Sequence, residues 1–467
     1  MIYDLNKSIK KDLEKEEYDV CIIGSGAAGI TIAKYLSKYN LKISLIEGGP
    51  LDFSKKSQDL YKGELIGDPY YPLDVVRLRY LGGSTNHWGG MSRPFDEVDF
   101  ERDYFGEEFK WPIKYFELKN YLKEACKILE IKNNFEYDQN DKDVKPIKFQ
   151  FSKVQFKTKY ESFLSNSKNI SLFINSNLKD LHGENRTLNK VTFESYNKNK
   201  IKISSKKFVF AMGGIENSRY LLWFQKKYNN KFFDDNRSIG KYWMEHPVFT
   251  LGKAFVKKTV FMKQYYSLTK SSQIEKKIFN CGLRMHGISS NSTKQLLKNL
   301  LCTAPKIGER ITNLLNKNLI CGVKLRAAWE QSPSKNSYIS LTNKTDKFEI
   351  PKISLKWSKN DLDRKTVKET VNIFNKWFLK NDYGRIQLDK WIIDNENYPE
   401  DDELGGLHHM GGTRMALNKN FGVVDKDCKI FGSNNIYIAG SSIFVTGGHN
   451  NPTLPIVQFS LRLAEHL

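Results

Sequence analysis

Residues 18–49 give the clearest prediction of the fold, and their sequence is YDVCIIGSGAAGITIAKYLSKYNLKISLIEGG. A β-branched run, three glycines, a helically spaced apolar segment and a second apolar run predict strand, tight turn, helix and strand. Gly24, Gly26 and Gly29 allow the turn, the approach of backbone to a pyrophosphate, and close helix packing. Glu47 ends the second strand at a spacing that suits hydrogen bonds to ribose hydroxyls. We therefore expect a dinucleotide without a 2′-phosphate, either flavin or nicotinamide.

A second glycine cluster, GGSTNHWGG at 82–90, follows this unit. Its four glycines let the chain lie against a flat ligand, and its small polar side chains can reach phosphates or a ring edge. A simple turn would not require the central His87-Trp88 pair, although such a pair can also serve only for packing. The cluster favours a second contact with the cofactor.

Later segments of the chain also show the patterns of β-strands. KKFVFAMGG (206–214) is typical of a buried strand, whereas ICGVKLRAAWEQ (320–331) alternates as in an antiparallel sheet with one covered face. The predicted fold class is α/β, a discontinuous nucleotide-binding domain with an inserted α+β substrate domain built on an antiparallel sheet. The expected division assigns 16–100, 200–250 and 400–467 to the nucleotide-binding domain, and 101–199 and 251–399 to the substrate-binding domain.

Composition narrows the function classes. The 467 residues include 40% hydrophobic and 13% aromatic residues, enough for a large core. The six cysteines are scattered without a C-x-x-C pair, which fits a reducing compartment and no structural zinc. No secretory leader or transmembrane run is evident, so we expect a cytoplasmic protein. The net charge of +21 comes from dispersed lysines, which favours a solvated surface over an anionic substrate or membrane, and nucleic acid least.

Several motifs together resemble the glucose–methanol–choline (GMC) oxidoreductase family. They are the fingerprint at 24–29, LGGST at 81–85, FVFAMGGIENSRYLL at 208–222, IGKYWMEHP at 239–247, and the C-terminal HHMGGTRM, VVD and NPTL segments. Within the family, the chain is most similar to the bacterial sugar dehydrogenase and pyranose oxidase branch. The resemblance implies a Rossmann-type FAD-binding domain, and hydride transfer from a substrate carbon to the flavin.

The resemblance also implies site residues. His409 falls on the catalytic histidine and Asn451 on a position that holds His or Asn. His87 falls where some relatives attach the flavin covalently, which we regard as the less favoured alternative here. Predicted FAD contacts are Gly24, Ser25, Gly26, Gly29, Glu47, Gly83, Ser84, Asn86, His87, Gly213, Gly440, Ser441, Asn451 and Thr453.

The residue chemistry agrees with that assignment. Histidine has an ordinary pKa of about 6.5 and suits proton removal from a hydroxyl, so we predict neutral His409 as the base. Asn451 would hydrogen-bond the developing alkoxide, and the following helix would stabilise negative charge on the flavin. Two alternatives stay open: Asn451 could simply cap that helix, and His408 could exchange roles with His409 or only pack. His246 is expected to be structural and His449 to lie beside the pocket.

The predicted function is an FAD-dependent oxidoreductase, with dehydrogenase favoured over oxidase, acting on the CH–OH group of a sugar or sugar derivative. Its partners would be the alcohol and an electron acceptor, which could be a small molecule, a quinone or a redox protein. No metal is needed. The alternatives are an FAD enzyme with a redox-neutral cycle, an NAD-dependent dehydrogenase, and a non-catalytic flavin- or glycan-binding protein.

Overall fold

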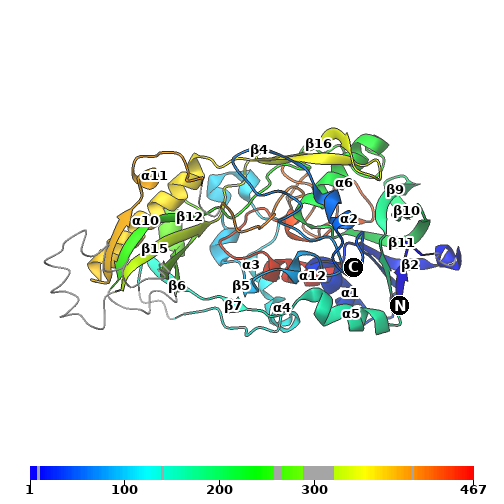
Figure 1. Cartoon of the computed structure of the whole chain (residues 1–467), viewed down its shortest axis with the longest axis horizontal. Coiled ribbons are helices and arrows are strands. Elements are labelled where there is room, and N and C mark those ends of the chain that lie inside the picture. Colours follow the sequence, from blue (N-terminus) through cyan, green and yellow to red (C-terminus); the bar gives the residue numbers. More distant parts are fainter. Residues whose placement is uncertain (8–10, 138–140, 257–263, 288–319, 401–403) are drawn as a thin grey trace.

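An eight-stranded mixed sheet lies at one end of the molecule (Figure 1). The computed structural model describes all residues except 8–10, 138–140, 257–263, 288–319 and 401–403. The sheet order is β1-β8-β3-β2-β11-β10-β9, and β19 also pairs with β11. The strands are β1 (Ile2–Asp4), β2 (Glu17–Ile23), β3 (Ile43–Ile46), β8 (Ile170–Ile174), β9 (Asn177–Glu184), β10 (Thr187–Glu194), β11 (Lys200–Phe210) and β19 (Ile436–Ile438).

The central strands of this sheet are parallel, because crossovers return the chain to the same edge. β2 pairs in parallel with both β3 and β11, and all four residues of β3 are buried. Near-continuous apolar runs such as ISLI are what a parallel sheet covered on both faces requires. The predicted βαβ unit is thus present, with α1 (Ala27–Leu36) as its crossover helix.

The large sheet extends beyond its expected bounds. Strands β8, β9 and β10 lie within 101–199, the segment assigned from sequence to the substrate-binding part, but they pair inside the eight-stranded sheet. The reason is that β9, β10 and β11 form an antiparallel meander, whose last strand continues into the parallel core. The local sequence pattern carries no information on which sheet such strands join.

A second, antiparallel sheet occupies the opposite end of the molecule in Figure 1. Its order is β18-β12-β15-β14-β13-β6. The strands are β6 (Val144–Ile147), β12 (Val248–Val256), β13 (Tyr265–Leu268), β14 (Cys281–Gly287), β15 (Ile320–Trp329) and β18 (Gly384–Leu388). The amphipathic helix α10 (Asp361–Lys380) begins at the Asn360 cap and packs Val367, Val371 and Phe374 into the core of this sheet.

Smaller elements surround these two sheets. β16 (Tyr338–Thr345), β17 (Pro351–Trp357) and β4 (Glu64–Gly67) form a third sheet, and β5 (Met91–Ser92) pairs with β7 (Gln150–Phe151). Within the described residues, the other α-helices are α2 (Lys55–Gln58), α3 (Tyr115–Lys119), α4 (Leu122–Ile128), α5 (Phe156–Asn166), α6 (Gly213–Tyr228), α7 (Lys270–Lys276), α11 (Lys390–Ile393) and α12 (Thr453–His466). Among the described residues, no helix has the length and hydropathy needed to cross a bilayer.

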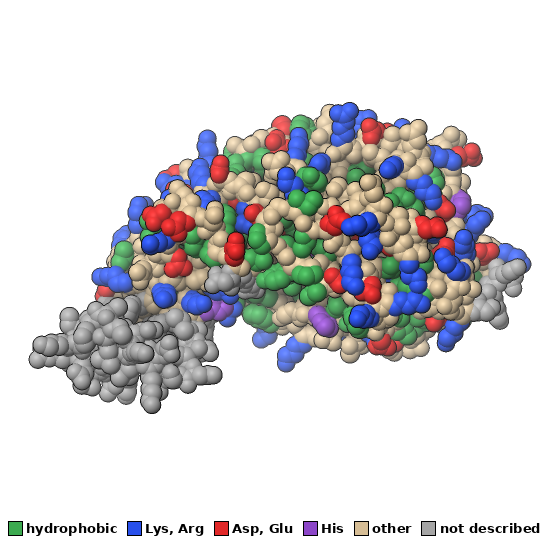
Figure 2. All heavy atoms as spheres, turned by 45° about the horizontal axis from the view of Figure 1, so that its top comes forward, with side chains coloured by type: hydrophobic (Ala, Val, Ile, Leu, Met, Phe, Trp, Pro, Cys, Tyr) green, Lys and Arg blue, Asp and Glu red, His purple; other side chains and the backbone are tan. Residues whose placement is uncertain are grey.

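Charged side chains are dispersed over one face of the molecule. On the face drawn in Figure 2, lysine and arginine side chains alternate with acidic ones. This distribution matches the dispersed lysines of the sequence.

Candidate functional site

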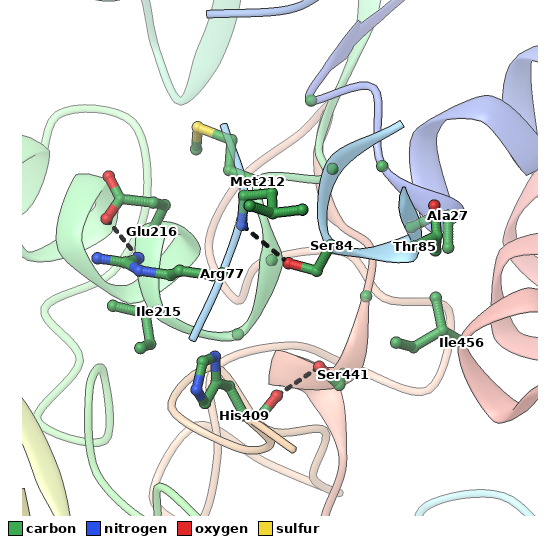
Figure 3. Close-up of a pocket in the computed structure, with 18 of the residues that line it drawn as sticks. Ala27, Arg77, Ser84, Thr85, Met212, Ile215, Glu216, His409, Ser441 and Ile456 are labelled. Carbon is green, nitrogen blue, oxygen red and sulfur yellow. Dashed lines mark hydrogen bonds and ion pairs between the residues drawn. The ribbon is translucent and has the colours of Figure 1, made fainter. Parts of the chain in front are cut away.

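One cavity of about 430 Å³ lies against the carboxyl ends of β2, β3 and β11. This edge of an open parallel sheet is where ligands of α/β proteins bind. Segments far apart in the chain line it: the 23–28 turn, the 46–48 strand end, the 83–91 loop, the 211–216 turn, 406–409, 440–441 and 451–456. Figure 3 shows Ala27 and Thr85 on one side of the cavity, Arg77 and Glu216 on another, and His409 with Ser441 below.

The fingerprint glycines have distinct physical roles. A Cβ on Gly29 would lie 1.8 Å from the carbonyl oxygen of Gly24, so this glycine is needed for helix α1 to pack on the turn. A Cβ on Gly26 would meet nothing within 4 Å, and this glycine faces the cavity. Gly24 has a φ of +116°, which only glycine adopts readily. The turn therefore exposes bare backbone to a ligand.

Glu47 directly follows β3, and its side chain is buried at the cavity wall. Its Oε2 accepts a hydrogen bond from Ser25 Oγ at 2.5 Å, and its Oε1 accepts one from the Gly49 backbone N–H at 2.7 Å. These donors hold the carboxylate at the strand end, where it can meet hydroxyl groups.

Three helices begin at the cavity. Residues at the N-termini of α1, α6 and α12 all line it, namely Ala27, Gly213 and Thr453. Each N-terminus presents free backbone N–H groups and the positive end of a helix dipole. A Cβ on Gly213 or on Gly440 would meet nothing within 4 Å, so both backbones are open toward the space. The cavity is therefore suited to an extended, negatively charged ligand with flat rings.

Two predicted cofactor contacts do not line the cavity. Gly29 packs against Gly24, as described above. Asn86 is buried, and its Nδ2 donates to the Leu81 carbonyl oxygen at 2.8 Å while its Oδ1 accepts from the Lys157 N–H at 3.3 Å. Asn86 thus holds the shape of the 82–90 loop. The other predicted contacts line the cavity: Gly24, Ser25, Gly26, Glu47, Gly83, Ser84, His87, Gly213, Gly440, Ser441, Asn451 and Thr453.

Asn451 contacts His408, not His409. Its Nδ2 lies 3.1 Å from His408 Nε2, and both side chains line the cavity. Asn451 makes no side-chain cap on α12, whose first residues follow Pro452. The imidazole beside the Asn451 amide is thus that of His408, and the catalytic roles expected for His409 and Asn451 stay predictions. On the other side, His408 Nδ1 lies 2.8 Å from Nδ1 of His246.

His409 also lines the cavity, on a different set of contacts. Its Nε2 lies 3.1 Å from the hydroxyl of Tyr70, and that hydroxyl donates to a carboxylate oxygen of Glu245. Ser441 Oγ donates to the His409 carbonyl oxygen at 2.5 Å (Figure 3). Tyr70 and Glu245 were not singled out from sequence. Glu245 directly precedes His246 in the IGKYWMEHP motif, which is the only signal for it in the chain.

Burial sets the protonation of this cluster. It lowers the pKa of His408 well below its ordinary value. A positive charge on His246 or His409 would lower this pKa further. Burial lowers the pKa of His409 to about 3, with a contribution from Arg77, and that of His246 to about 4. All three rings are therefore neutral near pH 7. Burial raises the pKa of Glu245 to about 7, against the hydrogen bonds that it accepts.

The structure also gives the positions of two other histidines considered from the sequence, His87 and His449. His87 is exposed and lines the cavity, so its covalent role stays a prediction. His449 is buried behind the site, where its Nε2 lies 3.7 Å from Asp96 Oδ2. At the wall, Arg77 forms a buried ion pair with Glu216 at 2.8 Å (Figure 3), a contact that sequence reasoning did not find.

Comparison with solved structures shows a shared fold. A formate oxidase aligns over 96% of this chain and 98% of its own, with a TM-score of 0.56 and 16% identity. An Aspergillus oryzae RIB40 formate oxidase variant, from work on FAD modification, aligns equally widely, with a TM-score of 0.55 and 17% identity. Pyridoxine 4-oxidase from Mesorbium loti aligns over 96% and 99%, with a TM-score of 0.57 and 12% identity.

Sequence comparison gives shorter matches. Capsanthin/capsorubin synthase from Capsicum annuum is 43% identical over 103 residues, which cover 20% of this chain and 20% of that protein. Residues 333–460 match the family described as GMC oxidoreductase, and this match includes His408, His409 and Asn451. The C-terminal part of this chain therefore resembles that family, and nearly the whole chain shares the fold of the oxidase structures.

Proposed function

We propose that this protein is an FAD-dependent oxidoreductase that acts on the CH–OH group of a small alcohol. The observation that carries the proposal is a single cavity, in which the dinucleotide fingerprint and the His408–Asn451 pair meet. A nucleotide-binding turn alone would suit many functions. A proton acceptor and an amide donor in the same space suit alcohol oxidation.

The cavity residues fit FAD. Gly24 and Gly26 with the N-terminus of α1 would hold the pyrophosphate, and the carboxylate of Glu47 would accept hydrogen bonds from ribose. The N-terminus of α12, beside Asn451, would face the pyrimidine edge of the flavin. When bound, FAD supplies the two-electron acceptor for hydride from the substrate carbon.

His408 is the proposed proton acceptor. Its ring is neutral near pH 7, and its Nε2 faces the Asn451 amide in the cavity. The hydroxyl proton of the alcohol would pass to Nε2 of His408, while Asn451 Nδ2 hydrogen-bonds the oxygen as negative charge develops. His409, the base expected from sequence, has its Nε2 engaged with Tyr70, which supports a role in shaping the wall.

The proposed substrate class is a sugar or sugar derivative. This finer proposal rests on the resemblance of the 82–90 loop and the NPTL segment to the sugar-oxidising branch of the family. We propose a dehydrogenase, with an acceptor other than oxygen, in preference to an oxidase. We place the substrate-binding part on the antiparallel sheet β18-β12-β15-β14-β13-β6 and on the segments around it.

The test is anaerobic bleaching of the flavin. The purified protein should be yellow, and one member of a panel of free sugars, glycosides, nucleotide sugars, sugar acids and simple alcohols should reduce it. Re-oxidation by air and by a quinone, followed in parallel, separates oxidase from dehydrogenase. A colourless protein that is active only with added NAD would overturn the flavin proposal. Turnover without net consumption of any acceptor would instead establish the redox-neutral cycle.

A further inference from the structure

We propose that His246 is a positioning residue that keeps the ring proton of His408 on Nδ1, so that the Nε2 lone pair of His408 faces Asn451 in the cavity. The consequence for rate rests on the proposed function. The protonation pattern itself follows from contacts among three residues and one carbonyl group, and does not depend on the substrate.

His246 forms the buried end of this series of contacts. His246 is buried, and its Nε2 lies 2.7 Å from the carbonyl oxygen of Gly448. A carbonyl oxygen can only accept, so Nε2 of His246 must carry the hydrogen. Because burial lowers the pKa of His246 to about 4, the ring is neutral and its Nδ1 holds a lone pair.

The next contact fixes the second ring. Nδ1 of His246 lies 2.8 Å from Nδ1 of His408, with the rings at 82° to each other. One nitrogen must donate and the other accept, and His246 has only its lone pair to offer there. His408 Nδ1 is therefore the donor. The neutral ring of His408 then has its lone pair on Nε2.

The last contact agrees with this direction. Nε2 of His408 lies 3.1 Å from Nδ2 of Asn451, an N–H donor that matches a lone pair. The opposite tautomer of His408 would place N–H against N–H at this contact and lone pair against lone pair at His246. It would also leave no basic nitrogen for a hydroxyl proton beside Asn451.

The backbone holds the two rings in register. The N–H groups of His246 and His408 both donate to Oε1 of Glu245, each at 2.7 Å. Residues 162 positions apart in the chain are thereby fixed to one buried carboxylate oxygen. These shared hydrogen bonds suit a positioning role, since each ring has little freedom to turn away from the other.

Three substitutions of His246 separate its two contacts. His246→Asn retains an acceptor oxygen near the place of Nδ1, His246→Gln retains a donor toward the Gly448 carbonyl, and His246→Leu retains neither. We expect His246→Leu to slow flavin reduction by tenfold or more at saturating alcohol, with KM and FAD content nearly unchanged. His246→Asn should recover most of that loss, and His246→Gln should not.

The direct measurement is the tautomer of His408 in the FAD-loaded protein without substrate. Two-bond ¹H–¹⁵N correlation spectra of ¹⁵N-histidine-labelled protein, assigned by the missing signal in His408→Gln, should show the hydrogen on Nδ1. His246→Leu should move it to Nε2 or to a mixture, and His246→Asn should restore it. A wild-type His408 protonated at Nε2, or an unchanged tautomer in His246→Leu, would refute the proposal. The wild-type spectrum requires neither a substrate nor a folded His246→Leu variant. It therefore determines the tautomer of His408 even if no alcohol reduces the flavin.

Discussion

At the scale of single residues, the two adjacent histidines give the sharpest test of the chemistry. His408 touches Asn451, whereas Nε2 of His409 is bonded to Tyr70. We expect His408→Gln to lower the rate of flavin reduction by roughly 10²–10⁴-fold, the usual contribution of a positioned base. His409→Gln, the matched control, should lower it far less. Stopped-flow reduction with retained FAD absorbance measures both, and the reverse order would return the base to His409.

The pH dependence of the same step is a separate prediction. Burial lowers the pKa of His408 well below the ordinary value of about 6.5. The neutral, proton-accepting form therefore persists as pH falls, and is lost only on passing below that lowered pKa. The rate of anaerobic flavin reduction should stay flat from pH 8 to below pH 6. A loss of rate centred near pH 6.5 would mean that the base titrates as an exposed histidine.

Sequence could predict which residue types meet at this site, but not their pairing. The motif order placed an imidazole and the Asn451 amide in one cavity, and both line it. Which of two consecutive histidines faces the amide depends on the local direction of the chain at 408–409, and single-sequence spacing carries no such information. Tyr70, Glu245 and His246 join the cluster only through tertiary packing.

At the scale of elements, the local pattern of residues 18–49 determined its structure. Gly-rich turn chemistry and apolar periodicity act within a few residues, so β2, α1 and β3 formed as predicted. The local pattern could not indicate that β8 to β10 pair in the large sheet, because strand pairing is a long-range property.

The turn between β2 and α1 supplies a paired prediction. Gly29→Ala puts a methyl group 1.8 Å from the Gly24 carbonyl oxygen, so the thermal midpoint should fall sharply even without FAD. Gly26→Ala meets no protein atom within 4 Å, so the apoprotein should remain as stable as wild type. Its methyl group enters the cavity, and we expect FAD affinity to drop tenfold or more. Thermal scans of apoprotein and FAD titrations distinguish the two. Equal effects of both substitutions would contradict the assigned roles.

At the scale of the whole molecule, a buried charge cluster joins the segment after the cofactor loop to the second sheet. Arg102 is fully buried and lies 3.2 Å from Asp99 Oδ1 and 3.0 Å from Glu330 Oε2, just beyond the end of β15. It also donates to the Ile278 carbonyl oxygen, which precedes β14. Burial raises the pKa of Asp99 to about 7, and the negative charge of Glu330 adds to the rise, while Arg102 opposes it.

Removing this arginine should therefore loosen the connection between the two parts in a pH-dependent way. Arg102→Met leaves two buried carboxylates without their cation, which typically costs about 3–5 kcal/mol. The folded-state pKa of Asp99 would rise further, so its protonation in the folded state relieves the cost as pH falls. The deficit in urea-unfolding free energy should be largest above pH 7 and smaller at pH 5. Lys344→Met, which breaks an exposed pair with Glu64, is the control and should change nothing measurable. A deficit for Arg102→Met that is independent of pH would point to lost packing rather than to uncompensated charge.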